Sequence, residues 1–230
     1  MTSLYFLILL VSFIIPFLYS IFYLDFIKKW KNFLLSTTIV AVIFLIWDAI
    51  FTKNGVWGFE EKYYLGFKIL KMPIEEWLFF YIIPFCSLFT HYAFFYKFQE
   101  IKLKKSSTVL LTVVLIFISL SLLFVYNNRA YTFINYIFLS VVLIVGVLYK
   151  IELLQKFYIT FLIILVPFII VNGILTGAIT EQPVVWYDNT ENLGIRLGTI
   201  PVEDIGYAFS MLFGNMLIFE KLNTKYSYGN

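Results

Sequence analysis

The sequence predicts an all-α membrane protein of about seven transmembrane helices, arranged as a three-plus-one-plus-three parallel internal repeat. Three observations predict this fold. Hydrophobic residues make up 61% of the 230 residues and charged residues 13%, with a mean hydropathy of +0.89, whereas soluble domains are about 45–50% apolar and about 25% charged. The apolar residues fall into seven uncharged runs, and two similar acidic motifs occur in the two halves of the chain.

The same composition excludes several classes of protein and site. Cys86 is the single cysteine, so no disulfide scaffold can form within the chain. One cysteine and one histidine, His91, cannot supply the four ligands of a structural zinc ion, and no metal site is expected. The net charge of +3 is small and scattered, which argues against nucleic acid as a partner. There is no glycine-rich phosphate-binding motif, and hence no expected nucleotide cofactor.

The seven runs are interpreted as membrane-spanning helices, because a bilayer core of about 30 Å needs roughly 20 apolar residues. The runs are Leu4–Leu24, Phe33–Trp47, Trp77–Tyr96, Ser106–Asn128, Ala130–Tyr149, Phe157–Thr180 and Ile205–Phe219. The second and the seventh hold only 15 residues each. To span a membrane, the second must include Asp48, and the seventh must include Glu203 and Asp204.

The lysines and arginines predict the orientation of the helices. When the loops are assigned alternately to the two faces of the membrane, one face carries eleven Lys and Arg residues and the other carries six. Cytoplasmic loops are enriched in these residues, so we expect the N-terminus outside and the C-terminus in the cytoplasm. The first run is long and is not followed by a small-residue cleavage site, which predicts an anchor helix and not a signal peptide.

Two segments of the chain are similar to each other without a gap. Leu65–Glu76 reads LGFKILKMPIEE, and Leu193–Asp204 reads LGIRLGTIPVED. Upstream of them, Asp48–Thr52 (DAIFT) is similar to Asn172–Thr176 (NGILT), and a tryptophan lies in each intervening loop. Because both matches occur in the same order, they indicate a duplication.

The duplication divides the chain into three predicted parts. Residues 1–100 form a first repeat of three helices, residues 101–129 contain a linker helix, and residues 130–230 form a second repeat of three helices. Four crossings separate the third helix from the seventh, so the two repeats run in the same direction. A pseudo-twofold axis along the membrane normal would then bring both acidic segments to one side of the bilayer.

The acidic motifs supply the predicted catalytic residues, which are Glu75 and Glu76 in the first copy and Glu203 and Asp204 in the second. Each motif follows a proline at a helix start, where carboxylates also complement the helix dipole, and this structural role is the alternative. The duplication and the membrane depth of the acids favour a functional role. Asp48, on the same side, is the fifth predicted catalytic residue. If burial keeps one of these acids protonated, that acid can donate a proton.

Five further residues are predicted to bind substrate. Trp57 and Trp186 lie in corresponding loops, and an aromatic face stabilises a cation by roughly 0.5–2 kcal/mol, although interfacial packing is the alternative for each. Lys68 and Arg196 lie five residues before the two prolines. They could hold an acid ionised, or extend along the membrane interface. Asn172 replaces the aspartate in the second copy.

A set of residues, most of them in the first copy, carries a resemblance to a known family. It comprises Asp48, Asn54–Phe59 (NGVWGF), Gly66, Pro73–Phe80 (PIEEWLFF) and, in the second copy, Pro201–Asp204 (PVED). These residues resemble the membrane-integral lycopene cyclases of carotenoid biosynthesis, in the fused form of the bacterial heterodimeric enzymes, along nearly the whole chain. The resemblance implies a bacterial inner-membrane protein. The second copy lacks the aspartate and an aromatic pair after the acids, which indicates that the principal acid lies in the first copy.

The resemblance implies the conversion of linear lycopene to a cyclic carotene, a redox-neutral isomerisation that needs no cofactor. The partners are then an apolar polyene and membrane lipid. The expected product is β-carotene, and the residues leave β, ε and γ rings open. A protonated Glu75 or Glu76 would add a proton to the terminal double bond of the ψ-end. The internal double bond would attack the resulting cation, and Glu203 or Asp204 would remove the final proton.

Two other functions are compatible with the residues. A hydratase or another carotenoid-modifying enzyme would capture the same cation with water. A small-solute transporter could use the same repeat architecture. It would need polar residues at mid-depth in both halves, whereas here the polar groups gather at one face.

Overall fold

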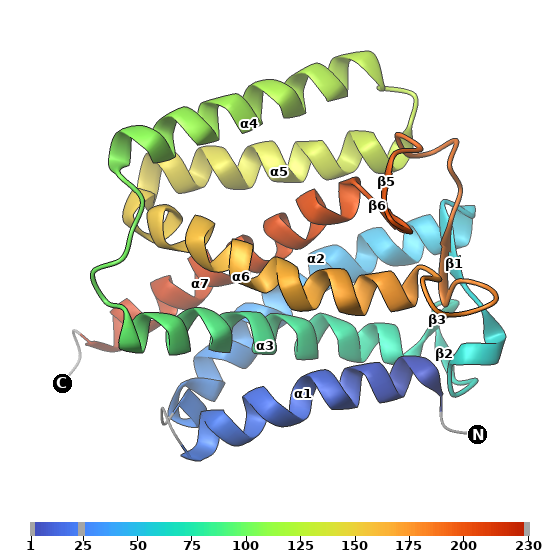
Figure 1. Ribbon diagram of the computed structural model, residues 1–230, viewed down its shortest axis with the longest axis horizontal. Coiled ribbons are helices and arrows are strands. Elements are labelled where there is room, and N and C mark those ends of the chain that lie inside the picture. The colour runs from blue at the N-terminus through green and yellow to red at the C-terminus, as the bar shows by residue number, and fades with distance from the viewer. Residues whose placement is uncertain (1–2, 23–25, 228–230) are drawn as a thin grey trace.

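The computed structural model is a bundle of long α-helices with three two-stranded sheets at one end (Figure 1). It describes residues 3–22 and 26–227, with side chains as far as residue 223. The helices are α1 (Leu4–Phe22), η1 (Phe26–Lys29), α2 (Trp30–Asn54), η2 (Glu61–Tyr63), α3 (Ile74–Lys97), α4 (Lys105–Val125), α5 (Ala130–Tyr149), α6 (Ile151–Leu175) and α7 (Glu203–Ser227). The strands are β1 (Trp57–Phe59), β2 (Lys68–Ile69), β3 (Met72–Pro73), β4 (Val185–Tyr187), β5 (Arg196–Leu197) and β6 (Ile200–Pro201).

Among the described residues, six helical segments are long and apolar enough to cross a membrane, namely α1, η1 with α2, α3, α4, α5 and α6. The seventh helix, α7, has 25 residues, or about 37 Å at 1.5 Å per residue. It carries more polar side chains because it lies inside the bundle, where it packs against α2, α3 and α5. The predicted fold class, an all-α integral membrane protein with an internal repeat, is confirmed.

The helix bounds differ from the predicted runs where polar residues take part. As expected, α2 includes Asp48, and α7 begins at Glu203. The predicted end of the first helix, Leu24, lies outside the described residues. The sixth helix ends at Leu175, earlier than predicted, because Gly177 turns the chain with a φ of 102°. Only glycine adopts such a backbone conformation readily.

The duplicated segments fold into matching hairpins, which explains why their sequence is retained. In the first copy β2 pairs with β3, and in the second copy β5 pairs with β6. The backbone N–H of Ile74 donates to the carbonyl of Phe67 (3.0 Å), and that of Val202 donates to Ile195 (3.1 Å). Each hairpin thus ends on a proline that lies one or two residues before a helix, α3 or α7, and each of these helices has an acidic pair in its first turn.

The two repeats meet across a pseudo-twofold axis. Between the repeats, α2 contacts α7, and the equivalent pair, α6 and α3, is also in contact. Within the repeats, α1 packs against α3 as α5 packs against α7. Both α2 and α6 run toward the strands (Figure 1). The strands β1 and β4 pair antiparallel with Gly58 opposite Trp186. Gly58 and Trp186 are 128 residues apart, as are Leu65 and Leu193 in the matched segments. Gly58 and Trp186 are therefore equivalent positions of the two repeats, so the axis passes through this ribbon.

Candidate functional site

A cavity of about 230 Å³ lies between the two repeats. It is lined by α1, α2, α3, α5, α6 and α7 and by one face of the β1–β4 ribbon. Most of its wall is apolar, with side chains such as Ile83, Ile164, Phe168, Met211 and Leu212. The exceptions include three carboxyl groups, one from each of α2, α3 and α7. These are Asp48, Glu76 and Asp204, here called the cavity carboxyls.

Asp48 is held by hydrogen bonds on one oxygen only. Its Oδ1 accepts from the indole N–H of Trp57 (2.5 Å) and from the hydroxyl of Thr52 (3.2 Å). Its Oδ2 is buried and has no hydrogen-bond partner among the described residues. The side chain is 1% exposed. A buried carboxyl oxygen without a donor is costly, so this atom is available to a cationic or protonated group in the cavity.

The other two cavity carboxyls each bind a tyrosine from the first helix of a repeat. The hydroxyl of Tyr5, the second residue of α1, donates to Oε2 of Glu76. The hydroxyl of Tyr131, the second residue of α5, donates to Oδ1 of Asp204 (2.5 Å), and Tyr187 donates to Oδ2 (3.1 Å). The two acids are therefore equivalent in position, but Asp204 receives one donor more.

The first acid of each pair points away from the cavity into the hairpin that precedes it. Glu75 accepts hydrogen bonds from the backbone N–H of Leu65 (2.7 Å) and from Ser3 (2.9 Å). Glu203 accepts from the backbone N–H of Leu193 (2.6 Å) and from a threonine hydroxyl of α5 (2.8 Å). Both side chains are fully buried, and neither lines the cavity. They tie each hairpin to its own repeat.

The β1–β4 ribbon presents different residues on its two faces, because successive side chains of a strand alternate. Trp57 and Tyr187 face each other and line the cavity. Trp186 lies on the other face, is 40% exposed, and covers Gly58. A Cβ at position 58 would lie 2.3 Å from Cζ2 of Trp186, so only glycine fits there. The two tryptophans of the duplicated loops thus occupy different environments.

Aromatic rings surround the end of the cavity that holds the carboxyls. Trp57, Tyr131, Tyr187 and Tyr207, here called the aromatic wall, all line the cavity. Ring centroids are 5.1 Å apart for Trp57 and Tyr131, 5.8 Å for Tyr131 and Tyr187, and 6.5 Å for Trp57 and Tyr207. Burial and the nearby Asp204 raise the pKa of Tyr187 well above its ordinary value, so its hydroxyl keeps the proton that it donates.

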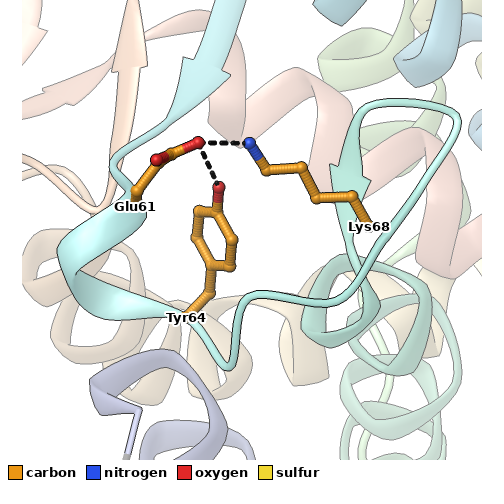
Figure 2. A network of polar contacts seen from close by, with 3 residues as sticks. All are labelled: Glu61, Tyr64 and Lys68. Carbon is orange, nitrogen blue, oxygen red and sulfur yellow. Dashed lines mark hydrogen bonds and ion pairs between the residues drawn. The ribbon is translucent and has the colours of Figure 1, made fainter.

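Of the remaining predicted residues, Asn172 lines the cavity and the two bases do not. Lys68 forms an exposed ion pair with Glu61 (2.6 Å), which also accepts from the hydroxyl of Tyr64 (3.3 Å; Figure 2). The Lys68 ammonium lowers the pKa of Glu61 below its ordinary value. Arg196 donates to the backbone carbonyl of Thr199 (2.5 Å) and to a neighbouring asparagine of the same loop. Both bases therefore bind partners within the loops that contain them.

Sequence reasoning missed Tyr5 and Tyr131. Each is a single tyrosine near the start of an apolar run, where it is typical of a membrane interface. Their shared place, second in the first helix of a repeat, was the only available signal. Within the described part of the chain, no three His, Cys, Asp or Glu side chains are grouped so that they could hold a metal ion.

The comparison with protein families settles which family this is. The family model described as lycopene cyclase matches residues 2–95 and 128–222, which together are most of the chain. The chain belongs to the lycopene cyclase family. The two matched segments correspond to the two repeats of this lycopene cyclase family member. Searches of curated proteins and of solved structures gave no significant match. Family membership places the chain in carotenoid biosynthesis, as a membrane enzyme of the cyclase kind that acts on a polyene.

Proposed function

We propose that this lycopene cyclase family member cyclises the ψ-ends of lycopene inside the cavity by acid–base chemistry, without a cofactor, and that β-carotene is the product. One observation carries the proposal: three carboxyls from both repeats meet at the end of a mostly apolar cavity lined by aromatic rings. An apolar polyene end fits such a cavity, and the reaction needs a proton donor, a proton acceptor and stabilisation of a cation.

Glu76 is the proposed proton donor. Its Oε2 accepts the hydroxyl of Tyr5, whereas its Oε1 has no hydrogen bond to a described residue and can turn to the substrate. Several carboxyls that share an apolar site do not all ionise together, which keeps one of them protonated. The proton of Glu76 adds to the terminal double bond, and the electron pair of that bond forms the new C–H bond. A tertiary cation remains on the neighbouring carbon.

The internal double bond then supplies its electron pair to this cation, which closes the six-membered ring and moves the positive charge onto a ring carbon. Asp204, with two tyrosine donors, is the proposed carboxylate that faces the ring cation and removes the final proton. Asp48 offers its unpartnered Oδ2 to the same cation. The aromatic wall adds roughly 0.5–2 kcal/mol per favourably placed ring. Positioned acids and bases typically contribute about 10²–10⁴-fold.

Glu75 and Glu203 are proposed to be positioning residues, because they hold the hairpins that set the start of α3 and α7. We also retain the three parts 1–100, 101–129 and 130–230 as the proposed repeat boundaries. The excess of lysine at the end of the bundle opposite the strands supports a cytoplasmic assignment of that end in a bacterial inner membrane. The cavity carboxyls would then lie on the outer side.

Expression in a lycopene-accumulating bacterium, followed by pigment chromatography, tests the proposal. We expect β-carotene in place of lycopene. Unchanged lycopene in cells that contain the folded protein would contradict a cyclase, and a hydroxylated product would indicate that water captures the cation. A Glu76→Gln variant expressed at the same level is the matched control, because it keeps the side-chain volume and removes the acidic proton.

A further inference from the structure

A second hollow, of about 720 Å³, lies at the opposite end of the bundle from the strands. Its lining residues come from η1, the end of α3, the end of α5, the start of α6 and the later part of α7. Figure 1 shows these ends of α3, α5, α6 and α7 at the side of the bundle away from the strands. None of its lining residues belongs to the cavity that holds the carboxyls. The reaction proposed above leaves this hollow without a role.

Lysines dominate the charge of this hollow. Four of them line it, from four different segments of the chain: Lys29, Lys102, Lys150 and Lys156. None forms an ion pair with a described residue. The ammonium of Lys29 lies 5.1 Å from the ring centroid of Tyr92, and that of Lys156 lies 5.1 Å from the ring centroid of Phe95. Both rings line the hollow and are here called its floor, so both lysines point into the hollow.

Two carboxylates line the same hollow, and they leave a positive balance. Glu220 accepts a hydrogen bond from the hydroxyl of Tyr92. Glu152 is exposed and lies in the first turn of α6. The floor also contains His91, whose Nδ1 lies 2.8 Å from the hydroxyl of Thr160. Four ammonium groups against two carboxylates favour an anionic ligand.

The start of α6 adds backbone donors to the lysines. Ile151, Glu152 and Leu153, the first three residues of this 25-residue helix, all line the hollow. The N–H groups of a first helical turn have no partner within the helix, and no side chain caps this one. A helix N-terminus surrounded by lysines is suited to a phosphate group.

Apolar side chains at the rim indicate that the anion carries hydrocarbon. Tyr149 is 76% exposed and Tyr96 is 61% exposed, and both line the hollow. Leu148 (67% exposed) and Ile27 (38% exposed) adjoin lining residues in the chain. Such a surface at the end of membrane-spanning helices lies at the depth of lipid headgroups, with acyl chains alongside. Basic pockets at the ends of transmembrane helices bind anionic headgroups in this way.

We propose that this hollow is a binding site for the phosphate of an anionic membrane phospholipid, held by the four lysines and the first turn of α6. Coulombic attraction and backbone N–H donors hold the phosphate, and the exposed apolar rim holds the upper part of the acyl chains. The site is separate from the carboxyl-lined cavity and does not depend on the reaction that takes place there.

Thermal unfolding of the purified full chain in an uncharged detergent tests this site. Short-chain phosphatidylglycerol, short-chain phosphatidylcholine and inorganic phosphate are titrated separately. We expect a saturable rise in Tm with phosphatidylglycerol and none with phosphatidylcholine. Lys150→Gln combined with Lys156→Gln should weaken the apparent affinity by roughly fivefold per lysine, about 25-fold for the pair. Glu152→Gln should strengthen it.

The matched control is Lys104→Gln with Lys105→Gln, which removes the same charge from exposed lysines at the same end that do not line the hollow. Equal weakening in the control would overturn the site in favour of general surface charge. An unchanged affinity in the Lys150/Lys156 pair, or an equal response to phosphatidylcholine, would also overturn it. A full response to inorganic phosphate alone would keep the phosphate site and overturn the lipid. Monodisperse elution of each variant on size exclusion establishes folding.

Discussion

The adjacent residues Glu75 and Glu76 give the sharpest prediction, because the structure gives them opposite surroundings. Glu76 lines the cavity, whereas Glu75 binds the backbone N–H of Leu65 and the hydroxyl of Ser3. A change to glutamine at either position keeps the volume and a carbonyl oxygen acceptor. It removes the ionisable group, so that position 76 can no longer donate a proton and position 75 can no longer be charged.

The expected magnitudes follow from these contacts. At position 76 the loss of the proton donor should lower the cyclisation rate by about 10²–10⁴-fold. At position 75 two hydrogen bonds to a carboxylate become bonds to a neutral amide. A hydrogen bond to a charged group typically contributes about 1.5–3 kcal/mol to stability, and one between neutral groups about 0.5–1.5 kcal/mol, a difference of about 1 kcal/mol per bond. Glu75→Gln should therefore cost about 2 kcal/mol of stability and leave the rate of the folded enzyme nearly unchanged.

Two measurements check this pair. Pigment chromatography of cells with equal amounts of each variant gives the activity, and thermal unfolding of the purified proteins in detergent gives the stability. We expect Glu76→Gln to be stable and inactive and Glu75→Gln to be active and less stable. Full activity of Glu76→Gln would refute its role as the acid. An equal loss of rate in folded Glu75→Gln would refute the separation of the two roles.

Four further predictions follow from the same contacts. Tyr131→Phe removes one donor from Asp204 and should slow cyclisation by about 10–100-fold, with equal rates arguing against a carboxylate there. Gly58→Ala forces its Cβ against Trp186 and should lower stability by about 1–3 kcal/mol; adding Trp186→Ala should restore part of it, and failure to do so would contradict the clash. Lys68→Gln should change the cyclisation rate by less than about twofold, because an exposed ion pair contributes little; a large loss would place Lys68 in the site. The cavity carboxyls of both repeats line one cavity, so the two ends of lycopene should be cyclised one after the other. A monocyclic carotene should then precede the bicyclic one in a time course, and its absence at all times would contradict a single shared site.

Much of the fold could be predicted because membrane helices and duplications leave strong patterns. The length of apolar runs predicted the helices, and the similarity of Leu65–Glu76 to Leu193–Asp204 predicted the duplication. That each of these segments forms a hairpin is known only from the structure. The bounds were less accurate. The end of α6 depends on the positive φ of Gly177, and the length of α7 depends on shielding by its neighbours.

The arrangement of the site was harder to predict because it depends on which way side chains point. Glu75 and Glu76 are neighbours in the sequence, yet they lie about 100° apart around a helix of 3.6 residues per turn. Which of them meets the cavity is decided by the positions of α1 and the hairpin. Trp57 and Trp186 look alike in the sequence, but strand alternation places them on opposite faces of the ribbon.

Cyclisation in deuterated water tests the central claim, that an acid of this cavity starts ring closure with an exchangeable proton. The purified chain is incubated with lycopene in deuterated water. The carotenes are then separated, and the number of deuterium atoms in each is measured by mass spectrometry. The account predicts one deuterium for each ring formed, with Glu76→Gln forming no labelled product. Cyclic carotene without deuterium, or labelled rings formed equally fast by Glu76→Gln, would contradict it.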